Sequence, residues 1–228
     1  MLLLLIGCET DQGLFVYTDD MAVTDTSAPA SPEDTSQPDD TPPPDDTQDT
    51  DDEQVAPPRA PRAGELVISE LMVNPVGVSD ETGEWVELYS AASVELDLSG
   101  LRLGDDGVDD AEVALIDPIV SPGELIVLCA SASSNGGVSC QGTYLYQSFG
   151  GGFALSNSED EVVVIAADGT VVDAIQYSEG FSVAGQSLGV APGCLDASAN
   201  DTASCWCAQS GALSSGDVGN PGSWNDGC

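Results

Sequence analysis

From residue 64 onward the sequence predicts an all-β domain of the sandwich or barrel class, and before it a long acidic stalk. Two observations predict the domain. Short apolar runs are broken at close intervals by Gly, Pro, Asp and Ser, and no run keeps a helical period over three turns. The stalk is predicted by a tract of Asp, Thr and Pro that is almost free of aliphatic residues and is therefore expected to be disordered.

The chain begins with a short apolar run, MLLLLIGC. Leu2 to Gly7 is far shorter than the ~20 residues that a membrane span needs. The residues LIGC resemble the lipobox of bacterial lipoproteins, and this resemblance implies cleavage after Gly7 and lipidation of Cys8, which would anchor the protein on a bilayer. No Lys or Arg precedes the run, unlike in an ordinary secretory signal. An apolar N-terminus without a role in targeting is the alternative.

These features divide the chain before the β domain into three segments. Residues 1–7 are interpreted as the remnant of a lipoprotein signal peptide, and residues 8–18 as a segment next to the anchor. Residues 19–63 are interpreted as a disordered linker rich in Asp, Thr and Pro. Repulsion between its carboxylates favours an extended linker, which would hold the domain away from the membrane.

The composition excludes several classes of function. The chain has a net charge of −37, no His, and only three residues that are Lys or Arg, all of them arginines. Nucleic acid is not an expected partner, because affinity for phosphate depends on Lys and Arg. Hydrolytic triads and Schiff-base chemistry lack their usual base and amine. Paired carboxylates could still catalyse, but an acid-rich surface brings such pairs together by chance, so we expect no enzyme.

Several runs carry the β prediction. Val86 and Leu88 share one face of a predicted strand. In the next run, residues 94–103, the alternation of apolar residues shifts by one position at Ser99-Gly100, where we therefore expect a turn or bulge. Asp168-Gly169 between two apolar runs predicts a tight hairpin. The predicted strand regions are ELVISELM (65–72), EWVELY (84–89), VELDLSGLRL (94–103), GELIVLC (123–129) and EVVVIAADGTVVDAIQY (161–177).

The same runs resemble a known family. ELVISELMVNP, GEWVELYSAAS, LDLSGLRLGD, SPGELIVLC, FALSNSEDEVVVIAADG and VVDAIQY, in this order, look like the lamin tail domain. The resemblance covers about residues 64–178 and implies an immunoglobulin-like β-sandwich without a shared catalytic constellation. Residues 179–228 are expected to form a cysteine-containing extension that packs on the sandwich.

Six cysteines remain once the lipidated Cys8 is set aside, an even number that fits an exported, oxidised domain. Six thiols allow 15 pairings, and the one-residue separation of Cys205 and Cys207 excludes their bridging each other. We predict the pairs Cys129–Cys140, Cys194–Cys205 and Cys207–Cys228. A zinc site is the competing interpretation, but no His and no C-x-x-C pair is present.

Two acidic clusters are candidate calcium ligands, because calcium prefers several carboxylate oxygens. One is Asp105, Asp106, Asp109 and Asp110; the other is the group in SDETGE, namely Asp80, Glu81 and Glu84. Neither follows the EF-hand pattern, and a solvated loop is the simpler interpretation in so acidic a chain. We therefore expect no cofactor. Trp85, Trp206 and Trp224 are expected to pack in the core or against the C-terminal extension.

Taken together, the sequence predicts a bacterial cell-surface lipoprotein that is held by its lipid anchor in the cell envelope, at the outer membrane or the cell surface. Its β-sandwich would serve adhesion by presenting loops and strand edges to another surface protein or a polysaccharide. The alternative is an accessory substrate-binding module in a secreted or envelope hydrolase system. A hydrolase encoded by a neighbouring gene would favour this alternative.

Overall fold

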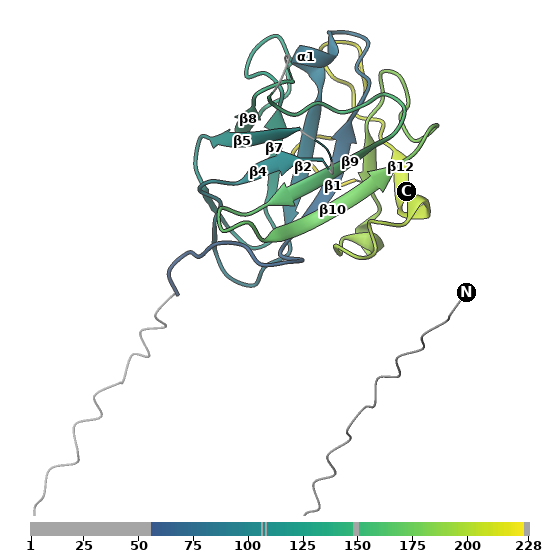
Figure 1. The fold of residues 1–228 in the computed structure, drawn as a ribbon. Helices are drawn as coiled ribbons and strands as arrows, with labels where there is room; N and C mark the ends of the chain where they lie inside the picture. Colours follow the sequence, from purple (N-terminus) through teal and green to yellow (C-terminus); the bar gives the residue numbers. More distant parts are fainter. Residues whose placement is uncertain (1–55, 106, 108, 148–150, 226–228) are drawn as a thin grey trace, which may run out of the picture. The chain divides into compact units, whose positions relative to one another are not determined.

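A computed structural model describes residues 56–105, 107, 109–147 and 151–225 (Figure 1). The predicted signal remnant, Cys8, the anchor-proximal segment and the linker up to residue 55 lie outside the described residues. Among the helices of the described residues, none is long and apolar enough to cross a membrane.

The described chain is almost entirely β-structure, which confirms the predicted fold class. Its helical elements are short: α1 (Asp80–Gly83), η1 (Pro192–Cys194) and η2 (Ala203–Cys205). The strands are β1 (Leu66–Met72), β2 (Trp85–Ser90), β3 (Leu96–Asp97), β4 (Arg102–Gly104), β5 (Asp110–Leu115), β6 (Ile119–Val120), β7 (Leu125–Cys129), β8 (Gly142–Tyr144), β9 (Asp160–Ile165), β10 (Val171–Tyr177), β11 (Leu188–Val190) and β12 (Trp206–Ala208).

Ten of these strands form one hydrogen-bonded order, β10-β9-β4-β5-β8-β7-β2-β1-β11-β12, and β3 pairs separately with β6. The long sheet curls into two layers, and β5 belongs to both because it pairs with β4 on one side and with β8 on the other. Figure 1 shows β9 and β10 crossing in front of β1 and β2. Of the pairs in this order, β7–β8 is parallel and the others are antiparallel.

The predicted turns are present where glycine conformation requires them. Gly169 has a φ of +89° in the β9–β10 hairpin, a conformation that favours glycine. Gly100, with a φ of +75°, lies in the turn that leads into β4. The inward residues on both sides of that turn, Leu98 and Leu101, are buried, which confirms the expected change of parity.

β1 contains a bulge that the alternation of its residues requires. Ile68 pairs with Leu88 and Glu70 pairs with Glu87, so Ser69 is an extra residue on β1. The bulge lets both Ile68 and Leu71 point into the main core, although their separation of three residues would place them on opposite faces of a regular strand. It also turns Glu70 toward the outer face of the sheet.

The main core lies between the two layers and contains apolar side chains from β1, β2, β7, β9 and β10. A second, smaller apolar cluster contains Met72, Trp85 and Val127 on the other face of the β1–β2–β7 layer. Leu213 packs against this second cluster, so the described part of the C-terminal extension, residues 179–225, covers the outer face of that layer. We call residues 179–225 the C-terminal segment. Because of this cover, every residue of β1 is buried.

The folded domain begins earlier than residue 64, which corrects the predicted end of the linker at residue 63. Arg59 forms an isolated bridge with Leu96, and its carbonyl oxygen accepts the N–H of Asp97 at 2.7 Å. The Arg59 guanidinium pairs with the Glu65 carboxylate at 2.5 Å. Residues 59–63 therefore pack on the domain through backbone and side-chain contacts that the composition of the tract does not reveal.

Candidate functional site

Two disulfides join segments of the described chain: Cys129–Cys140 and Cys194–Cys205, with Cα–Cα distances of 5.9 and 5.8 Å. They are two of the three pairs that the sequence predicts. Cys207 lies on β12, and Cys228, its predicted partner, is outside the described residues, so the third pair stays a prediction.

The first candidate calcium cluster does not converge on one point. The Asp105 carboxylate accepts the backbone N–H groups of Gly107 and Asp109, Asp109 accepts the Gln147 amide, and Asp110 pairs with Arg102. Asp106 lies outside the described residues. In the part of the chain that the structure describes, no three His, Cys, Asp or Glu side chains are arranged to hold a metal ion.

The second acidic cluster is split by burial. Asp80 is near the surface, where its carboxylate accepts the Asn157 amide at 3.1 Å. Glu84, at the C-terminal end of α1, is only 1% exposed and accepts the N–H of Leu155 at 2.8 Å. Burial raises the pKa of Glu84 to about 9, so this carboxyl is neutral at pH 7. The interpretation of this residue as part of a solvated loop is therefore wrong, because Glu84 directly follows α1 and its side chain is buried in the domain.

Glu70 and Glu87 form a buried carboxyl pair under the C-terminal segment. They lie opposite each other on β1 and β2. Glu70 accepts the Ser187 hydroxyl at 2.5 Å and the N–H of Asn220 at 2.9 Å. Glu87 accepts the N–H of Gly222 at 2.6 Å. Burial raises the pKa of Glu70 to about 7, and burial together with the Glu70 charge raises that of Glu87 to about 8. The pair holds the C-terminal segment on the sheet and is covered by it.

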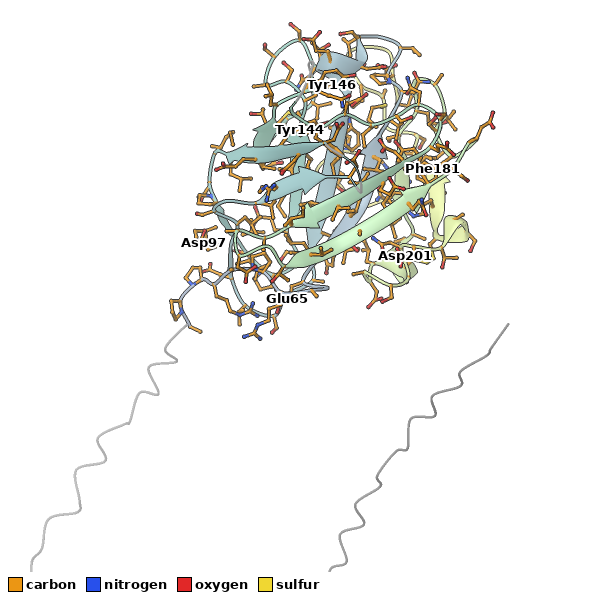
Figure 2. All side chains as sticks on the ribbon, in the orientation of Figure 1. Glu65, Asp97, Tyr144, Tyr146, Phe181 and Asp201 are labelled. Carbon is orange, nitrogen blue, oxygen red and sulfur yellow. A yellow bond between two sulfur atoms is a disulfide. The ribbon has the colours of Figure 1, made fainter. Side chains whose placement is uncertain are left out.

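An open groove lies between the end of β10 and the C-terminal segment, and it encloses about 270 Å³. We call it the β10 groove. Figure 2 shows Phe181 and Asp201, from its two sides, on the same flank of the domain. The residues that matter for its chemistry are Tyr177, Glu179, Phe181, Asn200, Asp201 and Trp206.

Aromatic rings form one wall of the β10 groove. Phe181 stacks on Tyr177 with ring centroids 4.9 Å apart, and it meets Trp206 edge-on at a centroid distance of 5.4 Å. The Trp206 indole N–H donates to the Asn200 carbonyl oxygen at 2.6 Å, which fixes the ring against the loop. Tyr177 is fixed in turn, because its hydroxyl donates to the Ser156 carbonyl oxygen at 2.7 Å. The wall is therefore rigid before any ligand arrives.

Asn200 also lines the groove and is 1% exposed. Its side-chain nitrogen donates to the Ile68 carbonyl oxygen at 3.2 Å and to the Asp173 carboxylate at 2.7 Å. Both partners are acceptors, so the amide orientation is determined. The remaining side-chain oxygen of Asn200 is buried without a hydrogen-bond partner among the described residues. A buried acceptor without a donor is unfavourable, and this oxygen has almost no accessible surface.

Carboxylates surround the β10 groove. Glu179 and Asp201 line it, and Glu159, Asp160 and Glu161 line a shallow depression next to it that shares Tyr177 with the groove. Among the described residues, no basic side chain lines either hollow. Two of the three arginines are paired with carboxylates elsewhere: Arg59 with Glu65 and Arg102 with Asp110.

The family model named Lamin Tail Domain matches residues 59–179, more than half of the chain. The chain belongs to the lamin tail domain family. The match begins at Arg59, where the structure also places the start of the domain. No curated protein and no solved structure matches the chain.

The lamin tail domain family is a non-catalytic, immunoglobulin-like family, which agrees with the observed sandwich. The β10 groove lies at the limit of the family match. Tyr177 and Glu179 belong to the lamin tail domain, whereas Phe181, Asn200 and Trp206 come from the C-terminal segment. The groove is therefore built by this chain from the family scaffold and an addition to it.

Sequence reasoning did not find this groove. It singled out Trp206, but as a packing residue, and it gave no role to Phe181 or Asn200. The available signal was the pair of aromatic residues Tyr177 and Phe181 at the end of the last predicted strand, with Trp206 further along the chain. Neither spacing nor composition shows that these side chains converge, because residues 182–205, which include β11, η1 and η2, separate Trp206 from the other two in the sequence.

Proposed function

We propose that this chain is a non-enzymatic lipoprotein of the bacterial cell envelope, anchored through Cys8, whose lamin tail domain binds a component of another surface. The β10 groove is the observation that carries the binding role. It combines aromatic rings and exposed carboxylates in one concave surface. The two disulfides suit an oxidising compartment outside the cytosol. The proposed role is adhesive.

The anchor is tested by replacing the predicted lipidated cysteine. The Cys8→Ser variant should move from the membrane fraction to the soluble fraction, because an unacylated acidic segment has no affinity for a bilayer. The measurement is an immunoblot of both fractions after a carbonate wash. A Cys8→Ser variant that stays in the washed membrane pellet would contradict the lipobox interpretation.

The binding role is tested by capture of partners from an oxidised envelope extract of the source organism. Wild type and Glu112→Gln should retain the same partner, since Glu112 is exposed on β5, away from the groove. Asp201→Asn, which removes the same charge at the groove, should retain less of it. Equal capture by all three would contradict a binding role for the groove. Recovery of a hydrolase as the partner would favour the role of an accessory substrate-binding module.

A further inference from the structure

The chemistry of the β10 groove identifies the class of ligand that it fits. The ligand must be small enough to enter a groove of about 270 Å³. It must tolerate or carry positive charge, because the charged groups that line the groove and the neighbouring depression are carboxylates. It must also pack against the rings of Phe181 and Trp206.

A guanidinium group meets all three requirements at once. It is planar and stacks on aromatic faces, it keeps its charge at every physiological pH, and its five N–H donors can reach several acceptors together. An ammonium group is a more compact and more strongly hydrated charge that lacks the planar face, so it fits the aromatic wall less well. The groove volume of about 270 Å³ suits one long side chain better than a folded surface.

The position of the groove indicates that the guanidinium is carried by a polypeptide. β10 is the end strand of the sheet order, and along its last residues, Ala174–Tyr177, it pairs with β9 alone among the described strands. The groove lies beside this stretch, since Ile175, Gln176 and Tyr177 line it. An end strand offers backbone donors and acceptors to an incoming extended segment.

We propose that the β10 groove binds an arginine side chain presented by an extended segment of a partner protein, which lies along the outer edge of β10. The arginine packs against Phe181 and Trp206 and pairs with Asp201 and Glu179. This inference rests on the proposed binding function and specifies its ligand.

The experiment is titration calorimetry of the full chain with the blocked peptide acetyl-Gly-Thr-Arg-Thr-Gly-amide in 0.15 M sodium chloride. Two matched peptides carry lysine or citrulline in place of arginine. The arginine peptide should bind most tightly, the lysine peptide several-fold more weakly, and the uncharged citrulline peptide more weakly still. Salt at this concentration screens the general attraction of an acidic protein for any cation.

Variants of the protein locate the binding. Asp201→Asn should weaken the arginine peptide about tenfold, the usual effect of losing one charge-assisted hydrogen bond. Phe181→Ala should weaken it several-fold. Glu112→Gln removes the same charge as Asp201→Asn but away from the groove and should change affinity less than twofold. If Phe181→Ala does not fold, as judged by circular dichroism, the comparison of Asp201→Asn with Glu112→Gln still tests the site, because Asp201 is exposed.

Equal binding of the arginine and lysine peptides, or equal losses from Asp201→Asn and Glu112→Gln, would overturn the proposal. So would the absence of binding at millimolar peptide. If the peptides fail in this way while Asp201→Asn still reduces partner capture from the envelope extract, the binding function stands and only the arginine ligand is wrong.

Discussion

Replacing Glu87 with glutamine should stabilise the domain at high pH and leave it unchanged at low pH. Glu87 lies opposite Glu70 under the C-terminal segment, where its carboxyl accepts the Ser69 hydroxyl at 2.8 Å and the N–H of Gly222 at 2.6 Å. Glutamine has nearly the same shape as the protonated carboxyl and keeps an acceptor oxygen for Gly222. The variant therefore differs from the wild type mainly when Glu87 would be charged.

The sign follows from the direction of the pKa shift. Burial raises the pKa of Glu87 from its ordinary value of 4.5 to about 8, so the folded state holds a proton that the unfolded state has already released. The stabilisation by the protonated carboxyl is complete below pH 4.5 and is lost as the pH rises through 8. At about 1.36 kcal/mol per pH unit the loss approaches roughly 5 kcal/mol. That is a large share of the roughly 5–15 kcal/mol that stabilises a typical domain.

The assay is thermal unfolding followed by circular dichroism between pH 4.5 and 9 at a constant 0.5 M sodium chloride. At pH 4.5, Glu87→Gln and wild type should melt together; at pH 9 the variant should melt roughly 10 °C higher. Glu112→Gln is the control, because it removes one negative charge from an exposed position on β5. Its melting temperature should follow the wild type at both pH values.

Two results would refute this reasoning. One is a Glu87→Gln variant that is less stable than wild type across the whole range, and the other is an equal gain from Glu112→Gln. If Glu87→Gln does not fold, the wild type alone still provides a test. Burial also raises the pKa of Glu84 to about 9 and that of Asp173 to about 6. The stability of the wild-type domain should therefore fall steadily from pH 4.5 to 9.

Three further predictions concern the disulfides, calcium and the linker. Reduction of the two disulfides, each of which joins residues 11 apart, should lower the free energy of unfolding by roughly 3 kcal/mol per disulfide. Sodium chloride should restore part of the lost stability. An unchanged melting temperature after reduction would contradict this prediction. Calcium chloride should raise the melting temperature no more than sodium chloride of equal ionic strength, and a saturable rise at micromolar calcium would instead indicate a site near Asp105, Asp109 and Asp110. Deletion of residues 19–55 should change the unfolding free energy, measured in urea, by less than about 1 kcal/mol. Deletion of residues 19–63 should destabilise the domain measurably, because it removes Arg59 and its contacts with Glu65 and Asp97. Equal effects of the two deletions would place the start of the domain elsewhere.

The fold could be predicted because its signals are local. The hairpin at Asp168-Gly169 and the parity change at Gly100 follow from backbone conformations that few residues adopt. The bulge at Ser69 was also readable, because Ile68 and Leu71 can face one core only if an extra residue lies between them. The bulge was nevertheless not among the predicted features.

The buried carboxyls and the groove could not be predicted, because they depend on contacts between distant parts of the chain. Glu87 alternates with Val86 and Leu88 as a solvent-facing side chain does. Only the C-terminal segment, which bonds Glu70 through Asn220, 150 residues away, makes Glu70 and Glu87 buried. Asn200 reaches the Ile68 carbonyl oxygen across 132 residues, and that contact leaves its own oxygen facing no donor. Nothing in the local sequence around Asn200 indicates either partner.

Hydrogen–deuterium exchange of the full chain, with and without the arginine peptide, tests the central claim most directly. The claim is that the domain recognises its partner at the β10 groove and the adjoining strand edge. Slower exchange should be confined to peptides that cover residues 174–181 and 200–206, and Asp201→Asn should abolish it while Glu112→Gln should not. Protection spread over other acidic surfaces, such as β5, or protection that persists in Asp201→Asn, would contradict the account.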